Sequence, residues 1–100
     1  MVSLREELGK TVSHKVLEAA LIKAADETGL KKMGDPDVSE RGECTCTTFH
    51  FKRFPFQAIE VTTYDHGHPT DFFRVYTDGI TSKKTVERYI ERVHNYLKKS

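Results

Sequence analysis

The sequence predicts a small α+β domain of two layers in the order α-β-β-β-α, with a three-stranded antiparallel meander and both helices packed on one face. Apolar residues recur at three- and four-residue steps over 4–28 and again over 82–97, as in amphipathic helices. Between these segments, over 44–78, apolar and polar residues alternate as in strands that bury one face. At 100 residues, the chain is expected to form one domain, 1–100.

The first helix is expected from Leu4 to Thr28. Ser3 and Glu6 have the spacing of a capping box, in which a hydroxyl and a carboxylate bond free backbone N–H groups at a helix start. The apolar positions that support this helix are Leu4, Leu8, Val12, Val16, Leu17, Ala20, Leu21 and Ala24. In the alternative, Gly9 breaks the helix and the first segment folds back on its own subunit.

Residues 31–43 are predicted to form a long flexible loop, because they contain glycine and proline and little that is apolar. A strand follows from Cys44, and Pro55 lies in a turn. A hairpin centred on Pro55 pairs two apolar couples on one face, Phe49 with Val61 and Phe51 with Ile59. A third strand adds Phe73 and Val75 to the same face.

The last helix is expected to begin after Thr81 or Ser82, either of which can cap it. Its core positions fit the helical period: Val86, Tyr89, Ile90, Val93 and Leu97. The chain has 16 basic and 15 acidic residues, a balance that excludes a histone-like tail or a polybasic membrane anchor. The charged start and the lack of any long apolar run predict an intracellular, cytoplasmic protein with no membrane contact.

The predicted hairpin brings two cysteines and two histidines to one end of the sheet. Cys44 and Cys46 would lie beside His66 and His68, and two thiolates with two imidazoles are a chemically reasonable set of zinc ligands. In the favoured interpretation, the cysteines are reduced, small buried side chains and the histidines are solvated turn residues. We therefore expect no cofactor, with a structural zinc ion as the alternative.

The face of the sheet away from the helices is the expected contact surface. Tyr64, Phe72 and Tyr76 are larger and more apolar than a merely hydrated face requires, and Arg74 lies among them. The function predicted from these four residues is that of a binding domain with an unspecified partner. In a less favoured alternative, His50 opposite Glu60 forms an acid–base pair, with Arg74 as a neighbouring cation, in a small enzyme.

Basic residues on the last helix provide the other alternative, nucleic-acid binding. The candidate contacts are Lys83, Lys84, Arg88 and Arg92, which could lie on a phosphate backbone. In its element order and in Ser82-Lys83-Lys84, the chain is similar in outline to double-stranded-RNA-binding domains. That resemblance implies phosphate contacts from the start of the last helix. The sequence departs from that family in the packing positions of this helix and in the place of its histidine-bearing loop.

The segment from Cys44 to Phe51 would form one edge of a three-stranded sheet. It contains no charged residue, glycine or proline that would discourage pairing with a second chain. The sequence therefore predicts a homodimer joined along this edge.

Overall fold

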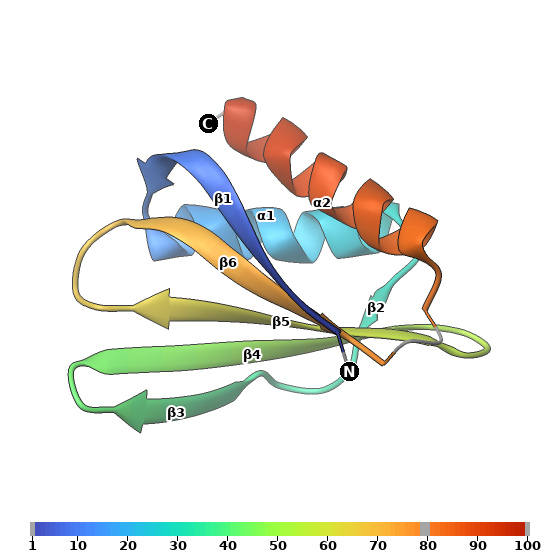
Figure 1. Ribbon diagram of the computed structural model, residues 1–100, viewed down its shortest axis with the longest axis horizontal. Helices are drawn as coiled ribbons and strands as arrows, with labels where there is room; N and C mark the ends of the chain where they lie inside the picture. The colour runs from blue at the N-terminus through green and yellow to red at the C-terminus, as the bar shows by residue number, and fades with distance from the viewer. Residues whose placement is uncertain (1, 79–80, 100) are drawn as a thin grey trace.

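The computed structural model describes residues 2–78 and 81–99, which form two helices and one antiparallel sheet of six strands. The elements in chain order are β1 (Val2–Val12), α1 (His14–Glu27), β2 (Lys31–Lys32), β3 (Asp37–Arg41), β4 (Cys44–Arg53), β5 (Gln57–Asp65), β6 (Thr70–Thr77) and α2 (Lys83–Lys98). The strand order across the sheet is β1-β6-β5-β4-β2, and β3 also pairs with β4. Both helices lie on one face of the sheet (Figure 1).

The α+β class and the antiparallel sheet are confirmed, but the sheet has six strands where three were predicted. The predicted hairpin register is also confirmed, since Phe49 lies opposite Val61 and Phe51 opposite Ile59. These four side chains are buried under the helices. A one-residue slip would have turned all of them toward solvent, so the apolar pattern determines the register.

The prediction of a helix from Leu4 is wrong, because residues 2–12 form β1, which pairs with β6. Apolar side chains four residues apart, such as Leu4 and Leu8, share a face in a strand as well as in a helix. Gly9 has a φ of 74°, a conformation outside the α-helix, and the β1–β6 register shifts between Glu7 and Val12. The end of β1 consequently rises toward the helical layer (Figure 1).

α1 begins ten residues later than predicted, at His14. Ser13 caps it, since the Ser13 hydroxyl accepts a hydrogen bond from the Val16 backbone N–H at 3.2 Å. The predicted capping box at Ser3 does not form, because Ser3 lies in β1 opposite Tyr76. With a strand as its first element, the chain also departs from the element order of double-stranded-RNA-binding domains.

The segment predicted to be a flexible loop, 31–43, contains both β2 and β3. β2 pairs Lys31 with Lys52, and β3 pairs Ser39 with Cys46. The exposed side chains of these strands carry no apolar pattern, so backbone hydrogen bonds to β4 hold them. β4 is therefore not an edge strand. The premise of the predicted homodimer is wrong, because the chain itself occupies that edge.

The core fills the space between the sheet and the two helices. Phe51 of β4 packs against Tyr89 of α2, with ring centroids 6.0 Å apart, and both are fully buried. Ser82 caps α2 by accepting from the Thr85 N–H at 3.2 Å, as one of the two predicted caps. Neither helix of the described residues is long and apolar enough to cross a membrane.

Candidate functional site

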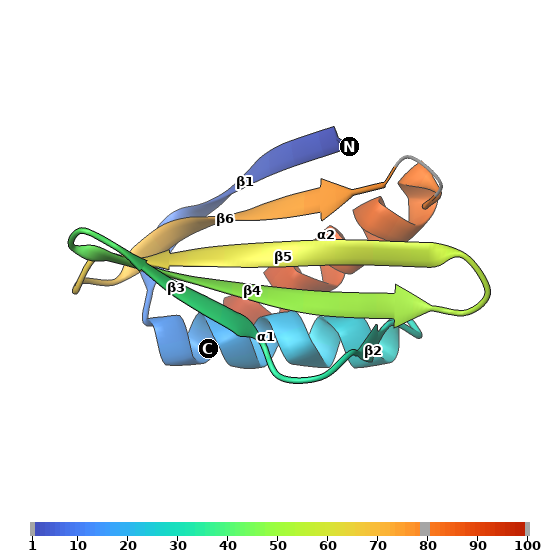
Figure 2. The ribbon, with the colours of Figure 1, turned by 90° about the horizontal axis from the view of Figure 1, so that it is seen from below.

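The open face of the sheet carries the residues that the sequence predicted as a contact surface. Figure 2 shows this face in front of the helices. Tyr64 of β5 and Phe72, Arg74 and Tyr76 of β6 are all half-buried there. β1 and β3 widen this face beyond the predicted three strands, so these side chains have neighbours on both sides that sequence reasoning missed.

Phe72 is covered on this face by two neighbours. Its ring stacks on that of Tyr64 with centroids 5.4 Å apart, and the guanidinium carbon of Arg5 lies 3.9 Å from its centroid. Arg5 in turn bonds Glu7 at 2.6 Å. Stacking and cation–π contact of this kind satisfy an aromatic ring within the chain. Phe72 is thus a supporting residue of the surface and offers less free area than the sequence suggested.

The hydroxyls of Tyr64 and Tyr76 lie 3.4 Å apart. Desolvation is the largest cause that raises the pKa of Tyr64, to about 12, and the hydrogen bond with Tyr76 adds to it. Arg74 bonds the hydroxyl of Ser3 at 3.4 Å. Tyr64 therefore remains a neutral donor and acceptor at physiological pH, and it forms one wall of the site together with Tyr76.

His50 lies between two carboxylates. Its Nε2 atom is 2.7 Å from Asp37 Oδ2, and its Nδ1 atom is 3.4 Å from Glu60 Oε1. The predicted partnership with Glu60 is present, while Asp37 comes from β3, in the segment expected to be a flexible loop. The contact with Asp37 is a hydrogen bond, while the contact with Glu60 is a longer approach within ion-pair distance. His50, Asp37 and Glu60 together connect β3, β4 and β5, and we call these three residues the cross-strand clamp.

A hollow of about 310 Å³ opens on this face beside the clamp. Its lining combines hydroxyls, a thiol and two charges: Ser39, Arg41, Cys46, Thr48, Glu60, Thr62, Tyr64 and Tyr76. The hydroxyls of Thr48 and Thr62 bond each other across the strands at 2.9 Å. The volume is near the lower end of the range of about 300–1,000 Å³ for ligand pockets. The site therefore suits a small ligand with polar groups.

The four residues of the alternative zinc site, Cys44, Cys46, His66 and His68, are not gathered into a metal-binding group. Within residues 2–78 and 81–99, no group of three or more histidine, cysteine or acidic side chains is arranged to hold an ion. The sulfur atoms of Cys44 and Cys46 lie 3.8 Å apart as free thiols, and the rings of His66 and His68 stack on each other. Desolvation first, then the contact with Cys46, raises the pKa of Cys44, so this thiol stays protonated.

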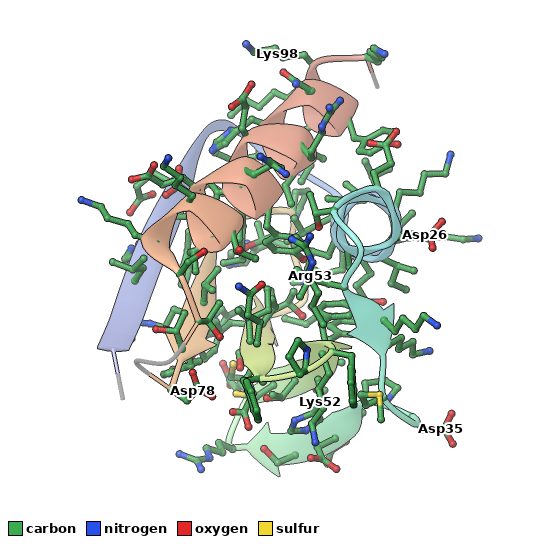
Figure 3. All side chains as sticks on the ribbon, turned by 90° about the vertical axis from the view of Figure 1, so that its right-hand side faces the viewer. Asp26, Asp35, Lys52, Arg53, Asp78 and Lys98 are labelled. Carbon is green, nitrogen blue, oxygen red and sulfur yellow. The ribbon has the colours of Figure 1, made fainter. Side chains whose placement is uncertain are left out.

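A second candidate region lies at the end of the sheet where β4 turns into β5 (Figure 3). Of the predicted nucleic-acid contacts, Lys84 and Arg88 line a hollow of about 410 Å³ there. Lys83 instead approaches Glu87 at 3.9 Å. Sequence reasoning missed Arg53, which lines the same hollow, and the exposed rings of the adjoining loop. The signal available was the run Phe-Pro-Phe at a predicted turn.

No protein-family model, curated protein or solved structure matches the chain. The contacts within this chain are therefore the basis for assigning a role to its residues. The two regions with the most distinctive contacts are the hollow on the open face and the turn between β4 and β5.

Proposed function

We propose that this domain works by binding rather than by catalysis, and that the hollow on the open face receives a short zwitterionic ligand such as a small peptide. One observation carries the proposal: polar side chains line the hollow between a cation and a carboxylate. By register, Arg41 lies at the level of Cys44 and Glu60 at the level of His50, with Thr48 and its neighbours between them.

The hollow offers complementary groups for each part of such a ligand. The Arg41 guanidinium is suited to a terminal carboxylate, and the Glu60 carboxylate to a terminal ammonium group. Hydroxyls of Thr48, Thr62 and Tyr76 can donate to or accept from peptide groups between them. Three extended residues span about 10 Å. The levels of Cys44 and His50 are about 20 Å apart along β4, so the side chains of Arg41 and Glu60 have to reach inward over the remaining distance.

The contacts of His50 support binding over acid–base chemistry. Asp37 is hydrogen-bonded to the Nε2 atom of His50 and Glu60 lies 3.4 Å from its Nδ1 atom, whereas a general base needs a nitrogen directed to its substrate. The same contacts favour a binding role, because the clamp holds β3 against β4. Arg41, at the end of β3, is thereby kept beside the hollow.

The test is a nuclear magnetic resonance titration of the isotope-labelled protein with triglycine. We expect saturable amide shifts at Thr48, Thr62 and Tyr64, and no such shifts with N-acetyl-triglycine amide, which lacks both terminal charges. Arg41→Ala should remove the response, while Lys15→Ala on the exposed start of α1 should leave it unchanged. Absence of saturable shifts at about 10 mM triglycine would mean that any affinity is weaker than millimolar, and this result would overturn the proposal. An equal response in the Arg41→Ala variant would do the same.

A further inference from the structure

The turn between β4 and β5 exposes two aromatic rings. Phe54 is 95% exposed and Phe56 is 74% exposed, the two highest values among the large apolar side chains described. They flank Pro55, and Met33 on the neighbouring segment is also largely exposed, at 47%. Rings of this size are normally buried, so an adjacent pair at the tip of a hairpin indicates an interaction surface.

Cations surround this turn on both sides of the sheet. On the helix side, Arg53 lies between α2 and α1 (Figure 3) and lines the hollow of about 410 Å³ with Lys84, Arg88 and Phe54. On the other side, a hollow of about 590 Å³ has Lys31 and Lys52 in its lining along with both rings. Arg53 and Phe54 belong to both hollows, so the two sites are continuous around the turn.

These cations are not neutralised within the described chain. None of Arg53, Lys84, Arg88, Lys31 and Lys52 lies within ion-pair distance of a carboxylate among residues 2–78 and 81–99. The acidic residue in the lining of the second hollow is Asp78, whose carboxylate accepts from Thr81. The turn therefore presents a local excess of positive charge, although the whole chain has a net charge of only +1.

The positive charge continues away from the turn along α2. Lys84, Arg88 and Arg92 follow one another at four-residue intervals, which places them on one side of the helix at steps of about 6 Å. All three are exposed. This row begins beside the turn of Phe54, Pro55 and Phe56, which we call the aromatic turn, and leads away from it. A linear polyanion could follow such a row.

We propose that the aromatic turn and this row bind single-stranded nucleic acid, with bases stacked on Phe54 and Phe56 and phosphates on Arg53, Lys84 and Arg88. Stacking requires a base with an accessible face, which a single strand provides and a duplex does not. A flat bilayer would meet the tip of the turn, but α2, which carries the row, runs away from that tip (Figure 1). A flexible strand can follow both. This site lies apart from the hollow on the open face and does not depend on it.

The experiment is fluorescence anisotropy with a labelled oligothymidylate of about 15 nucleotides, repeated over a range of salt concentrations. Three phosphate contacts predict a slope of about −2 for the logarithm of the association constant against that of salt. Phe54→Ala with Phe56→Ala should weaken binding by about 5- to 150-fold for each base that loses its stacking partner. Lys84→Glu with Arg88→Glu should also weaken it strongly.

Two variants serve as controls. Val38→Ala removes another exposed apolar side chain, on β3, and Lys15→Glu reverses an exposed charge on α1, and neither should change the affinity. Because Phe54 and Phe56 are largely exposed and do not belong to the buried core, their alanine variants should retain the circular dichroism spectrum of the parent.

Any of the following results would refute the proposal. The first is absence of salt-dependent binding to the oligonucleotide. The second is equal affinity for a duplex of the same length, and the next is binding that survives loss of both rings, since in either case stacking would play no part. The last is binding of the parent protein to phosphatidylglycerol vesicles but not to the oligonucleotide, which would assign the turn to a membrane surface instead.

Discussion

The hydroxyl of Tyr89 in α2 donates a hydrogen bond to the backbone carbonyl of Leu21 in α1, at 3.0 Å. Both residues are fully buried. This bond joins the two helices inside the core, directly above Phe51 of the sheet. Burial raises the pKa of Tyr89 well above its usual value, so the hydroxyl keeps its proton and remains a donor.

Tyr89→Phe is expected to lower the free energy of unfolding by about 1 kcal/mol, because it removes one buried hydrogen bond and keeps the ring. The cost is modest, since the Leu21 carbonyl retains its bond within the helix. Urea denaturation measures the change. Tyr76→Phe on the open face is the matched control and should cost less, since its hydroxyl bond is longer and only half-buried. Equal losses in both variants would contradict a structural role for the bond between the helices.

Two serines test where the first helix begins. Ser13→Ala should destabilise the protein by about 1 kcal/mol, because the Val16 N–H loses its capping partner, and Ser13→Asp should restore most of that loss. Ser3→Ala should have little effect, since Ser3 lies in β1. Thermal unfolding of the three variants provides the comparison. If Ser3→Ala were the more damaging substitution, the helix would begin where the sequence pattern suggested.

The stability of the protein should fall above about pH 10, and Tyr64 should contribute to that fall. The pKa of Tyr64 is about 12 in the folded chain, against an ordinary value of about 10 when unfolded. Between these values, the unfolded chain loses the proton and the folded chain keeps it, so rising pH favours unfolding. Below about pH 10, both states hold the proton and Tyr64 has no effect.

Urea denaturation of the parent and of Tyr64→Phe at about pH 9 and about pH 11 measures this contribution. The variant should lose less stability between the two pH values than the parent does, because it has no proton to lose at this position. Tyrosinate absorbance should show one fewer late-titrating group in the variant. An identical fall in both proteins would mean that Tyr64 titrates alike in the folded and unfolded states.

The elements predicted correctly are those whose apolar pattern allows one solution. In β4 and β5, Phe49, Phe51, Ile59 and Val61 can share a buried face in one register. In α2, Ser82 and a steady helical period define both the start and the buried side. These signals are local, so the sequence contains them in full.

The errors arose where partners lie far away in the chain. The spacing of Leu4 and Leu8 suits a strand and a helix equally. β6, which pairs with β1, begins 58 residues after β1 ends. β2 and β3 have no apolar pattern of their own, and they are strands because β4 offers them free backbone groups. The second carboxylate on His50 was missed for the same reason, since Asp37 reaches it only through β3.

Local patterning was therefore sufficient for the α+β class, the central hairpin, the last helix and the placing of Tyr64, Phe72 and Tyr76 on the open face. The position of β1, the covering of β4 by the chain itself, the clamp on His50 and the meeting of Arg53 with Lys84 and Arg88 depend on tertiary folding. The physical reason is that backbone pairing, and the gathering of charged side chains at one site, involve segments that are distant in sequence. Side-chain periodicity, in contrast, describes only the face that one segment buries.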